Sequence, residues 1–212
     1  MAPLESSQRL KSGATHPALI QDHPNGRKSS SGIFRSSRSH HNYSRVVSDS
    51  HSSTVADENI FKANSDATLF KSENLAGLGV VIRDWRGEAI DALTMSVPLA
   101  QTVVELEALA CRRAVQFAKE IGLTQVIFEG DSLSVIQAIL KGSLDALPYG
   151  NVIEDIRFQA MKFPLSVFTH VPRICNVVAD ALAKKAKTCR DTQVSLEELP
   201  EDIASLACFD VH

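Results

Sequence analysis

The apolar residues of the chain gather between residues 59 and 187, where their spacing alternates between two patterns. Short apolar runs bounded by turn residues are typical of strands, whereas apolar or small residues recurring every three or four positions are typical of helices. The short runs predict strands at residues 60–66, 80–83, 88–97, 124–130 and 165–171. The helical spacing predicts helices at residues 102–121, 132–140, 148–161 and 177–187.

A turn between the second and third predicted strands sets the first part of the topology. Asp84–Gly87 ends in glycine and has the composition of a tight hairpin connection. The first three strands are therefore expected to form an antiparallel meander. Because helices alternate with the remaining strands, the chain is expected to fold as an α/β domain, with a mixed five-stranded sheet and helices on both faces.

The longest predicted helix carries a charged residue on its buried side. Small residues at Cys111, Ala114 and Ala118 form one stripe, which suggests close packing against the sheet. Glu107 lies on the same stripe, and Gly122 is expected to end the helix. A buried carboxylate is costly unless a partner neutralises it, so a cation or a metal ion is a candidate partner for Glu107.

The composition divides the 212 residues into three parts. Residues 1–58 hold 14 serines and five of the seven histidines, and they are expected to be disordered because they bury too little apolar surface to offset ordering. Residues 59–187 form the predicted domain, with 14 basic and 14 acidic residues, and residues 188–212 form an acidic tail. A neutral domain has no global electrostatic attraction to nucleic acid, so binding would need a local basic patch.

The N-terminal arm, residues 1–58, leaves the compartment open between the nucleus and an organelle. Its serine and arginine content resembles that of organellar transit peptides, and a solvated tail or translated linker is the alternative. The four cysteines show no metal-ligand spacing and are interpreted as free thiols of a reducing, intracellular environment. No apolar run approaches ~20 residues and no secretory signal is visible, so neither a membrane span nor secretion is expected.

Four acidic residues stand at predicted strand ends or in the first turns of predicted helices: Asp66, Glu107, Asp131 and Asp180. Taken singly, each has an ordinary interpretation. Asp66 could begin a turn, and Asp131 could cap a helix. Asp180 could favour the helix dipole, and Glu107 could pair with an arginine. Ligands bind at the carboxyl ends of strands in open α/β sheets, so the same residues could instead converge on one site.

Five segments in this order carry a family resemblance: 65–67 (SDA), 77–87 (GLGVVIRDWRG), 106–115 (LEALACRRAV), 126–132 (VIFEGDS) and 170–186 (HVPRICNVVADALAKKA). Together they resemble the ribonuclease H-like domain of plants, which is also found beside reverse transcriptases in retroelements. The resemblance covers about residues 59–187, and residues 196–210 resemble the C-terminal extension of that family. It implies a five-stranded sheet ordered 3-2-1-4-5.

The resemblance also implies a metal-dependent endonuclease that hydrolyses the RNA strand of RNA–DNA hybrids with two Mg²⁺ ions, for which Mn²⁺ can substitute. By motif, Asp66 would bridge the two ions, and Asp180 would hold the ion that activates water. Glu107 and Asp131 would hold the ion at the leaving group, with Glu107 also near the ribose 2′-OH. Carboxylates suit this chemistry because Mg²⁺ prefers hard oxygen ligands. The hybrid is the expected partner, and the protein is expected to be a monomer.

The sequence departs from the family pattern in three places. Ala67 stands where a glycine usually follows the first aspartate, which would matter if that backbone needed a positive φ. The loop Pro172–Asn176 has no histidine, and the stretch from Gly142 to Pro164 lacks a basic helical extension. Ala67, the missing histidine and the neutral charge of the domain favour an alternative function, a non-catalytic nucleic-acid-binding module derived from a retroelement. A phosphate binder of doubly wound type ranks last, because no glycine-rich loop joins a strand to a helix.

Basic residues near two of the predicted helices are the candidates for gripping nucleic acid. We expect phosphate contacts from Arg112, Arg173, Lys184 and Lys185. The alternative is an ordinary solvated helix face.

Overall fold

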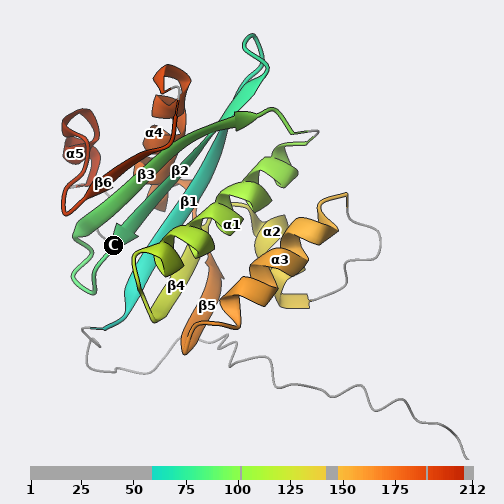
Figure 1. The fold of residues 1–212 in the computed structure, drawn as a ribbon, viewed down its shortest axis with the longest axis vertical. Coiled ribbons are helices and arrows are strands. Elements are labelled where there is room, and N and C mark those ends of the chain that lie inside the picture. Colours follow the sequence, from blue (N-terminus) through green and yellow to red (C-terminus); the bar gives the residue numbers. More distant parts are fainter. Residues whose placement is uncertain (1–58, 101, 142–147, 190, 208–212) are drawn as a thin grey trace, which may run out of the picture. The chain divides into compact units, whose positions relative to one another are not determined.

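The computed structural model describes residues 59–100, 102–141, 148–189 and 191–207 (Figure 1). The predicted disordered arm at residues 1–58 lies outside the described residues, as does Gly142. The strands are β1 (Phe61–Phe70), β2 (Leu75–Arg83), β3 (Ala89–Pro98), β4 (Gln125–Gly130), β5 (Leu165–His170) and β6 (Gln193–Leu196). The helices are α1 (Val103–Glu120), α2 (Leu133–Lys141), α3 (Gly150–Ala160), α4 (Val177–Lys185) and α5 (Glu201–Ala207), with 3₁₀ turns at Arg173–Cys175 and Ala186–Thr188.

All the described strands belong to one sheet, in the order β5-β4-β1-β2-β3-β6. The strands β1, β2 and β3 are antiparallel neighbours, whereas β4 runs parallel to β1 and β5 parallel to β4. The predicted meander, the mixed sheet and the order 3-2-1-4-5 of the first five strands are therefore confirmed, whereas the predicted count of five strands is wrong.

The sheet has a sixth strand that the sequence pattern does not predict. β6 pairs antiparallel with the outer edge of β3, and α5 follows it and packs against α4 through the buried Ile203. A four-residue strand has too short a pattern to recognise, and its hydrogen-bond partners come from a strand about 100 positions earlier in the chain. Part of the predicted acidic tail is thus built into the domain edge.

β1 is longer than predicted, and this changes the position of Asp66. The expectation that the first strand ends near Asp66 is wrong, because the strand continues to Phe70 and Asp66 pairs with Gly79 of β2. The second half of β1 contains Thr68 and Phe70, which favour strands, but Asp66 and Ala67 interrupt the pattern, so the ladder with β2 decides the length of the strand. Asp66 is consequently held inside the strand by its pairing with β2 rather than in a turn, one residue beyond the last β1–β4 pair, Ser65 with Gly130.

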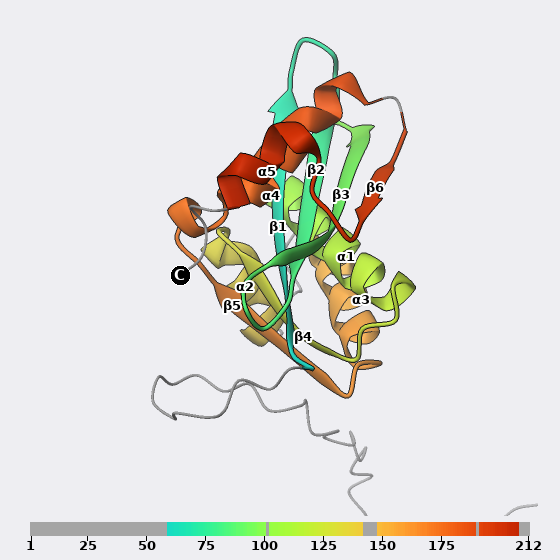
Figure 2. The same cartoon turned by 90° about the vertical axis from the view of Figure 1, so that its left-hand side faces the viewer.

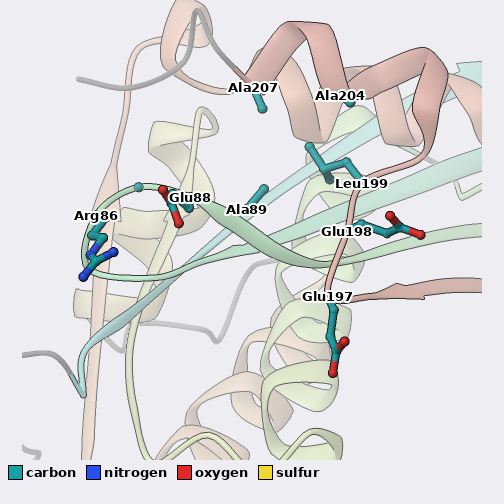
Figure 3. Close-up of a pocket in the computed structure, with 9 residues that line it drawn as sticks. Arg86, Glu88, Ala89, Glu197, Glu198, Leu199, Ala204 and Ala207 are labelled. Atoms are coloured by element: carbon teal, nitrogen blue, oxygen red, sulfur yellow. The ribbon is translucent and has the colours of Figure 1, made fainter.

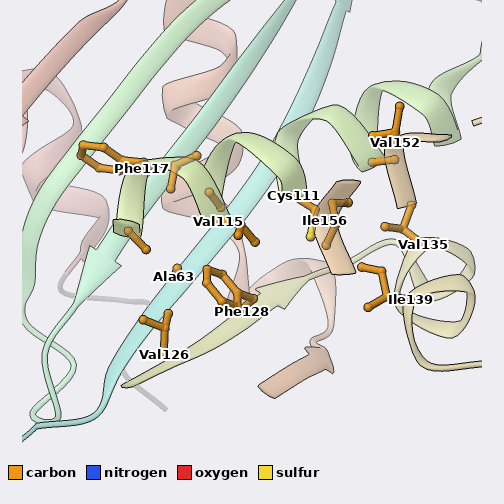
Figure 4. Close-up of a cluster of buried hydrophobic side chains, with 14 of the residues drawn as sticks. Ala63, Cys111, Val115, Phe117, Val126, Phe128, Val135, Ile139, Val152 and Ile156 are labelled. Carbon is orange, nitrogen blue, oxygen red and sulfur yellow. The ribbon is translucent and has the colours of Figure 1, made fainter. Parts of the chain in front are cut away.

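The helices lie on both faces of the sheet, as predicted (Figure 2). On one face, α1, α2 and α3 bury the largest apolar cluster against β1 and β4, with Phe128 and Ile156 among its members (Figure 4). On the other face, α4 and α5 pack on β2 and β3 around Val81 and Leu182. Within the described residues, no helix combines the length and the apolar content needed to cross a membrane.

The ends of α1 follow the signals in the sequence. The Thr102 hydroxyl accepts a hydrogen bond from the Glu105 backbone N–H, which satisfies a free donor at the start of the helix. Gly122 has φ +81°, so the predicted glycine stop is confirmed. Cys111 and Ala114 are buried on the predicted stripe, which directs Glu107 of the same stripe toward the sheet.

Two glycines of β2 let α4 approach the sheet unusually closely. A Cβ added at Gly77 or Gly79 would collide with the backbone of α4 at Ala183 or Ala179. The Thr94 hydroxyl of β3 donates a hydrogen bond to the Leu182 carbonyl oxygen of α4, at 3.2 Å. This close packing holds α4, and with it Asp180, directly over the middle of the sheet.

Candidate metal centre

Three of the four predicted acids converge on one point. Carboxylate oxygens of Asp66, Glu107 and Asp131 all lie within 4.8 Å of one another. Asp66 comes from the middle of β1, Glu107 from the second turn of α1, and Asp131 from the residue after β4. The parallel pairing of β1 with β4 places Ser65 beside Gly130, so the two aspartates that follow them are neighbours.

The fourth acid, Asp180, reaches the same point from the other face of the sheet. Its carboxyl group is largely buried and lies close enough to Asp66 to raise the pKa of that acid. Asp66 therefore lies near the other three acids, because α4 sits close on β2 and β1. The structure brings together all four residues that the motifs select.

Burial and the neighbouring acids raise the pKa values of two acids of the cluster. Burial, followed by the charges of Asp131 and Asp180, raises the pKa of Asp66 to about 7. Burial, followed by the charges of Asp66 and Asp131, raises the pKa of Glu107 to about 9. Both shifts mean that the metal-free site favours protonated carboxyls, since several anions crowd a partly desolvated space.

Two basic side chains flank Asp180. The Arg173 guanidinium lies 3.3 Å from one carboxylate oxygen, and the Lys184 ammonium lies 2.5 Å from the other. The nearby acids, Asp66 first, raise the pKa of Arg173 above its usual range, so this exposed side chain faces the whole cluster. Two of the four predicted phosphate contacts thus stand at the acids.

The other two predicted phosphate contacts form ion pairs elsewhere on the domain. Arg112 pairs with Asp155 at 3.7 Å and links α1 to α3. Lys185 donates to both carboxylate oxygens of Asp202 at 2.7 Å and links α4 to α5. These pairs give both residues a role in holding helices together, and their contact with nucleic acid stays a prediction.

Ala67, the first departure from the family pattern, fits the local backbone. It lies inside β1 and packs with Leu106 and Ala110 of α1. Its φ is not positive, whereas Asn74 and Glu197 are the described residues other than glycine with a positive φ. The Ala67 backbone hydrogen-bonds the Glu107 carboxylate and favours its charged form. The alanine therefore causes no distortion of the site.

Two asparagines near the acids were not predicted to belong to the site. Asn176 stands at the N-cap position of α4 and is a residue type that often caps helices, but its side chain makes no capping bond and instead donates to the Ser65 carbonyl oxygen of β1 at 3.0 Å. Asn64 donates to Glu129 at 3.0 Å, across the β1–β4 pair. An Asn-x-Asp spacing on one strand was the available signal for Asn64, since alternate residues share a face.

The domain also carries a groove that is separate from the acids. Its volume is about 410 Å³, and it lies between the β2–β3 turn and the C-terminal segment (Figure 3). The groove is lined by Arg86, Gly87, Glu88, Ala89, Glu197, Glu198, Leu199, Ala204 and Ala207. None of the four clustered acids is among these residues, so the groove is not part of the candidate centre.

The donor set fits a hard divalent cation. Four carboxylates offer oxygen ligands of the kind that Mg²⁺ and Mn²⁺ prefer. One of these oxygens, Asp66 Oδ2, is buried without a hydrogen-bond partner among the described residues. A cation there would satisfy this oxygen and relieve the repulsion that raises the two pKa values.

Comparison with known proteins gives a family and a fold. The sequence profile of the family described as reverse transcriptase-like matches residues 64–186. No curated protein matches the chain. The solved ribonuclease H1 of the archaeon Halobacterium salinarum is 25% identical, with a TM-score of 0.56, and the match covers 61% of this chain and 98% of that one. LC11-RNase H1, isolated from compost, is 25% identical with a TM-score of 0.54, covering 60% and 95%. The same enzyme has also been solved with an RNA/DNA hybrid, in a match of 24% identity and TM-score 0.53 that covers 59% and 95%.

Proposed function

Since the chain belongs to the reverse transcriptase-like family and has the ribonuclease H-like fold, we propose that it is a metal-dependent endonuclease that hydrolyses the RNA strand of RNA–DNA hybrids. The observation that carries this proposal is the convergence of Asp66, Glu107, Asp131 and Asp180 from four separate elements. Buried acids without function would be selected against because their mutual repulsion costs stability. The solved complex of LC11-RNase H1 with a hybrid supports the substrate class.

The arrangement of the acids supports two cation positions that share one ligand. Asp66 lies between Glu107 and Asp131 on one side and Asp180 on the other, so its carboxylate is the one that two ions could share. Two bound Mg²⁺ ions would supply an activated water and would stabilise the leaving oxygen. The four carboxylates would hold these ions, and the close packing of α4 on β2 fixes the position of Asp180 relative to Asp66.

The residues at the rim of the centre support a role in binding the substrate backbone. Arg173 and Lys184 neutralise Asp180 in this structure. A cation at Asp180 would release both side chains, which then lie where they can contact phosphates next to the acids. Glu107 extends from α1 to the cluster and is the candidate that senses the 2′-OH and so distinguishes RNA from DNA.

The test is cleavage of a labelled RNA–DNA hybrid in Mg²⁺ by the wild-type protein and by Asp131→Asn. We expect RNA-strand products from the wild type and a loss of at least about 100-fold in the variant. Asp155→Asn, a surface acid on α3, is the matched control and should cleave like the wild type. Equal background cleavage by wild type and Asp131→Asn would contradict the proposal, and duplex DNA and single-stranded RNA serve as substrate controls.

A second candidate function is a non-catalytic module that binds hybrids. The observation in its favour is that Arg173 and Lys184 both form ion pairs with Asp180. Hybrid binding that is independent of Mg²⁺ and unchanged by Asp66→Asn, together with no cleavage, would support this alternative. The same binding measurement, made by fluorescence anisotropy, separates it from the enzyme.

A further inference from the structure

The buried polar atoms that lack a hydrogen-bond partner are concentrated at one place. In the part of the chain that the structure describes, the side-chain atoms of this kind are Asn64 Oδ1, Asp66 Oδ2 and Asn176 Oδ1. All three residues are at least 98% buried. A buried oxygen without a donor costs about 1–3 kcal/mol, so such atoms call for an explanation. Three in one region suggest a ligand rather than three separate defects.

The orientation of both amides follows from their neighbours. Asn64 faces the Glu129 carboxylate, which is also paired with Lys62 at 3.5 Å and accepts hydrogen bonds. Asn176 faces the Ser65 carbonyl oxygen, which can only accept. The amide NH₂ group must therefore point at each of these acceptors. The Oδ1 atoms are left on the opposite side of each amide, and flipping either amide would break its one hydrogen bond.

The two asparagines flank Asp66. Asn64 lies two residues before it, on the same face of β1. Asn176 is bonded to Ser65, the residue immediately before Asp66, and stands one helical turn before Asp180. Both orphaned amide oxygens therefore belong to side chains next to two of the candidate metal ligands, Asp66 and Asp180.

We propose that Asn64 and Asn176 hold water molecules of the bound divalent cation, each amide oxygen accepting a hydrogen bond from a water ligand at Asp66. This inference rests on the proposed function, because it requires a cation at the four acids. Mg²⁺ keeps several water ligands in protein sites, and these waters are donors that need acceptors. The three orphaned oxygens would then be satisfied together, Asp66 directly and the two amides through water.

The choice of asparagine follows from the charge at the site. Further carboxylates beside Asp66 and Glu107 would add to a repulsion that already favours protonated acids. An amide oxygen accepts the same hydrogen bond without a charge. Glu129, paired with Lys62, has the separate role of fixing the Asn64 amide, so it acts as a positioning residue.

The test is isothermal titration calorimetry of Mn²⁺ into the full-length protein, without nucleic acid. Residues that orient the ligands of a metal typically change its affinity 10–100-fold when mutated. We expect Asn64→Ala and Asn176→Ala each to weaken Mn²⁺ binding about 10-fold or more. Asn64→Leu keeps the branched shape of the side chain and serves if the alanine variant does not fold.

Thr94→Val is the matched control. Thr94 is equally buried and also bonds α4 to the sheet, but it leaves no orphaned oxygen. It should bind Mn²⁺ within about twofold of the wild type, whatever its melting temperature. An equal loss of affinity in Thr94→Val would show that the asparagines act only by docking α4, and would overturn the inference.

The inference and the proposed function fail in different ways. If Asp131→Asn abolishes Mn²⁺ binding but Asn64→Ala and Asn176→Ala bind like the wild type, the asparagines hold an ordinary buried water and only the inference is wrong. If Asp131→Asn itself binds Mn²⁺ like the wild type, the acids are not the metal site and the proposed function fails as well.

Discussion

The packing of α4 on the two glycines of β2 predicts that adding one methyl group will disable the metal centre. In Gly79→Ala, the new Cβ would lie 2.9 Å from Leu182 Cβ, and closer still to backbone atoms of Ala179 and Ala183. The backbone of a helix cannot rotate away as a flexible side chain can. The whole of α4 must therefore shift, and Asp180 moves with it.

The size of the effect follows from the overlap. Carbon atoms in contact prefer about 3.5–4.0 Å, so the helix has to move outward by roughly 1 Å. Inserting a methyl group into a packed core costs about 1–3 kcal/mol, which lowers the melting temperature of a domain of this size by roughly 4–12 °C. A catalytic group misplaced by about 1 Å can cost about 100-fold in rate. The predicted variant is folded, less stable and nearly inactive.

The assay compares Gly79→Ala with Gly130→Ala by thermal unfolding and Mn²⁺ titration. Gly130 stands immediately before Asp131, but a Cβ there would meet only Ser65 atoms at 3.8 and 3.9 Å, which is ordinary contact. Gly130→Ala should therefore melt and bind Mn²⁺ like the wild type. Wild-type stability and metal affinity in Gly79→Ala would refute the claim that close packing of α4 positions Asp180.

Three further predictions concern charge. In the folded state the pKa values of Asp66 and Glu107 lie above their ordinary values, so the metal-free folded protein binds more protons than the unfolded chain. The melting temperature in EDTA should therefore fall as the pH rises from 5 to 9. Mn²⁺ affinity should rise over the same range, and Glu107→Gln should flatten both slopes. Arg173→Ala should bind Mn²⁺ more tightly, because it removes a cation that competes at Asp180, yet bind hybrid more weakly and with a salt slope smaller by about 1. Saturating Mn²⁺, at 100 times its Kd, should stabilise the wild type by about 2.7 kcal/mol, whereas Asp131→Asn should show little shift in thermal unfolding.

Many elements of the fold could be predicted from short stretches of the sequence. The β2–β3 turn illustrates this, since the Asp84 carboxylate accepts from the Arg86 and Glu88 backbone N–H groups and Gly87 has φ +84°. Such a turn depends on four or five consecutive residues, so its chemistry is visible in the sequence. β6 depends instead on the free edge of β3, and the true length of β1 depends on its pairing with β2. Neither partner can be read from the segment itself.

The residues of the candidate site could likewise be predicted only in part from the sequence. The four acids could be selected because their motifs occur in family order, although no spacing along the chain distinguishes Asp131 from Glu129 two residues earlier. Arg112 and Lys185 were equally plausible phosphate contacts in the sequence, and only the folded chain gives them Asp155 and Asp202 as partners. Asn176 is a residue type that often caps helices. Its hydrogen bond to the Ser65 carbonyl oxygen joins residues 111 positions apart, so the sequence could not indicate it.

The sequence by itself determined the elements, the α/β class and the types of residue at the centre, because periodicity, turn chemistry and hard oxygen ligands are local properties. The tertiary structure decided which acids share a point, how closely α4 approaches β2 and which buried oxygens are left without donors. These depend on distances between segments far apart in the chain. The acids can therefore be selected from the sequence. Two properties arise only once the sheet and its helices have packed: the burial that raises the pKa of Glu107 to about 9, and the amide oxygens beside Asp66 that lack a donor.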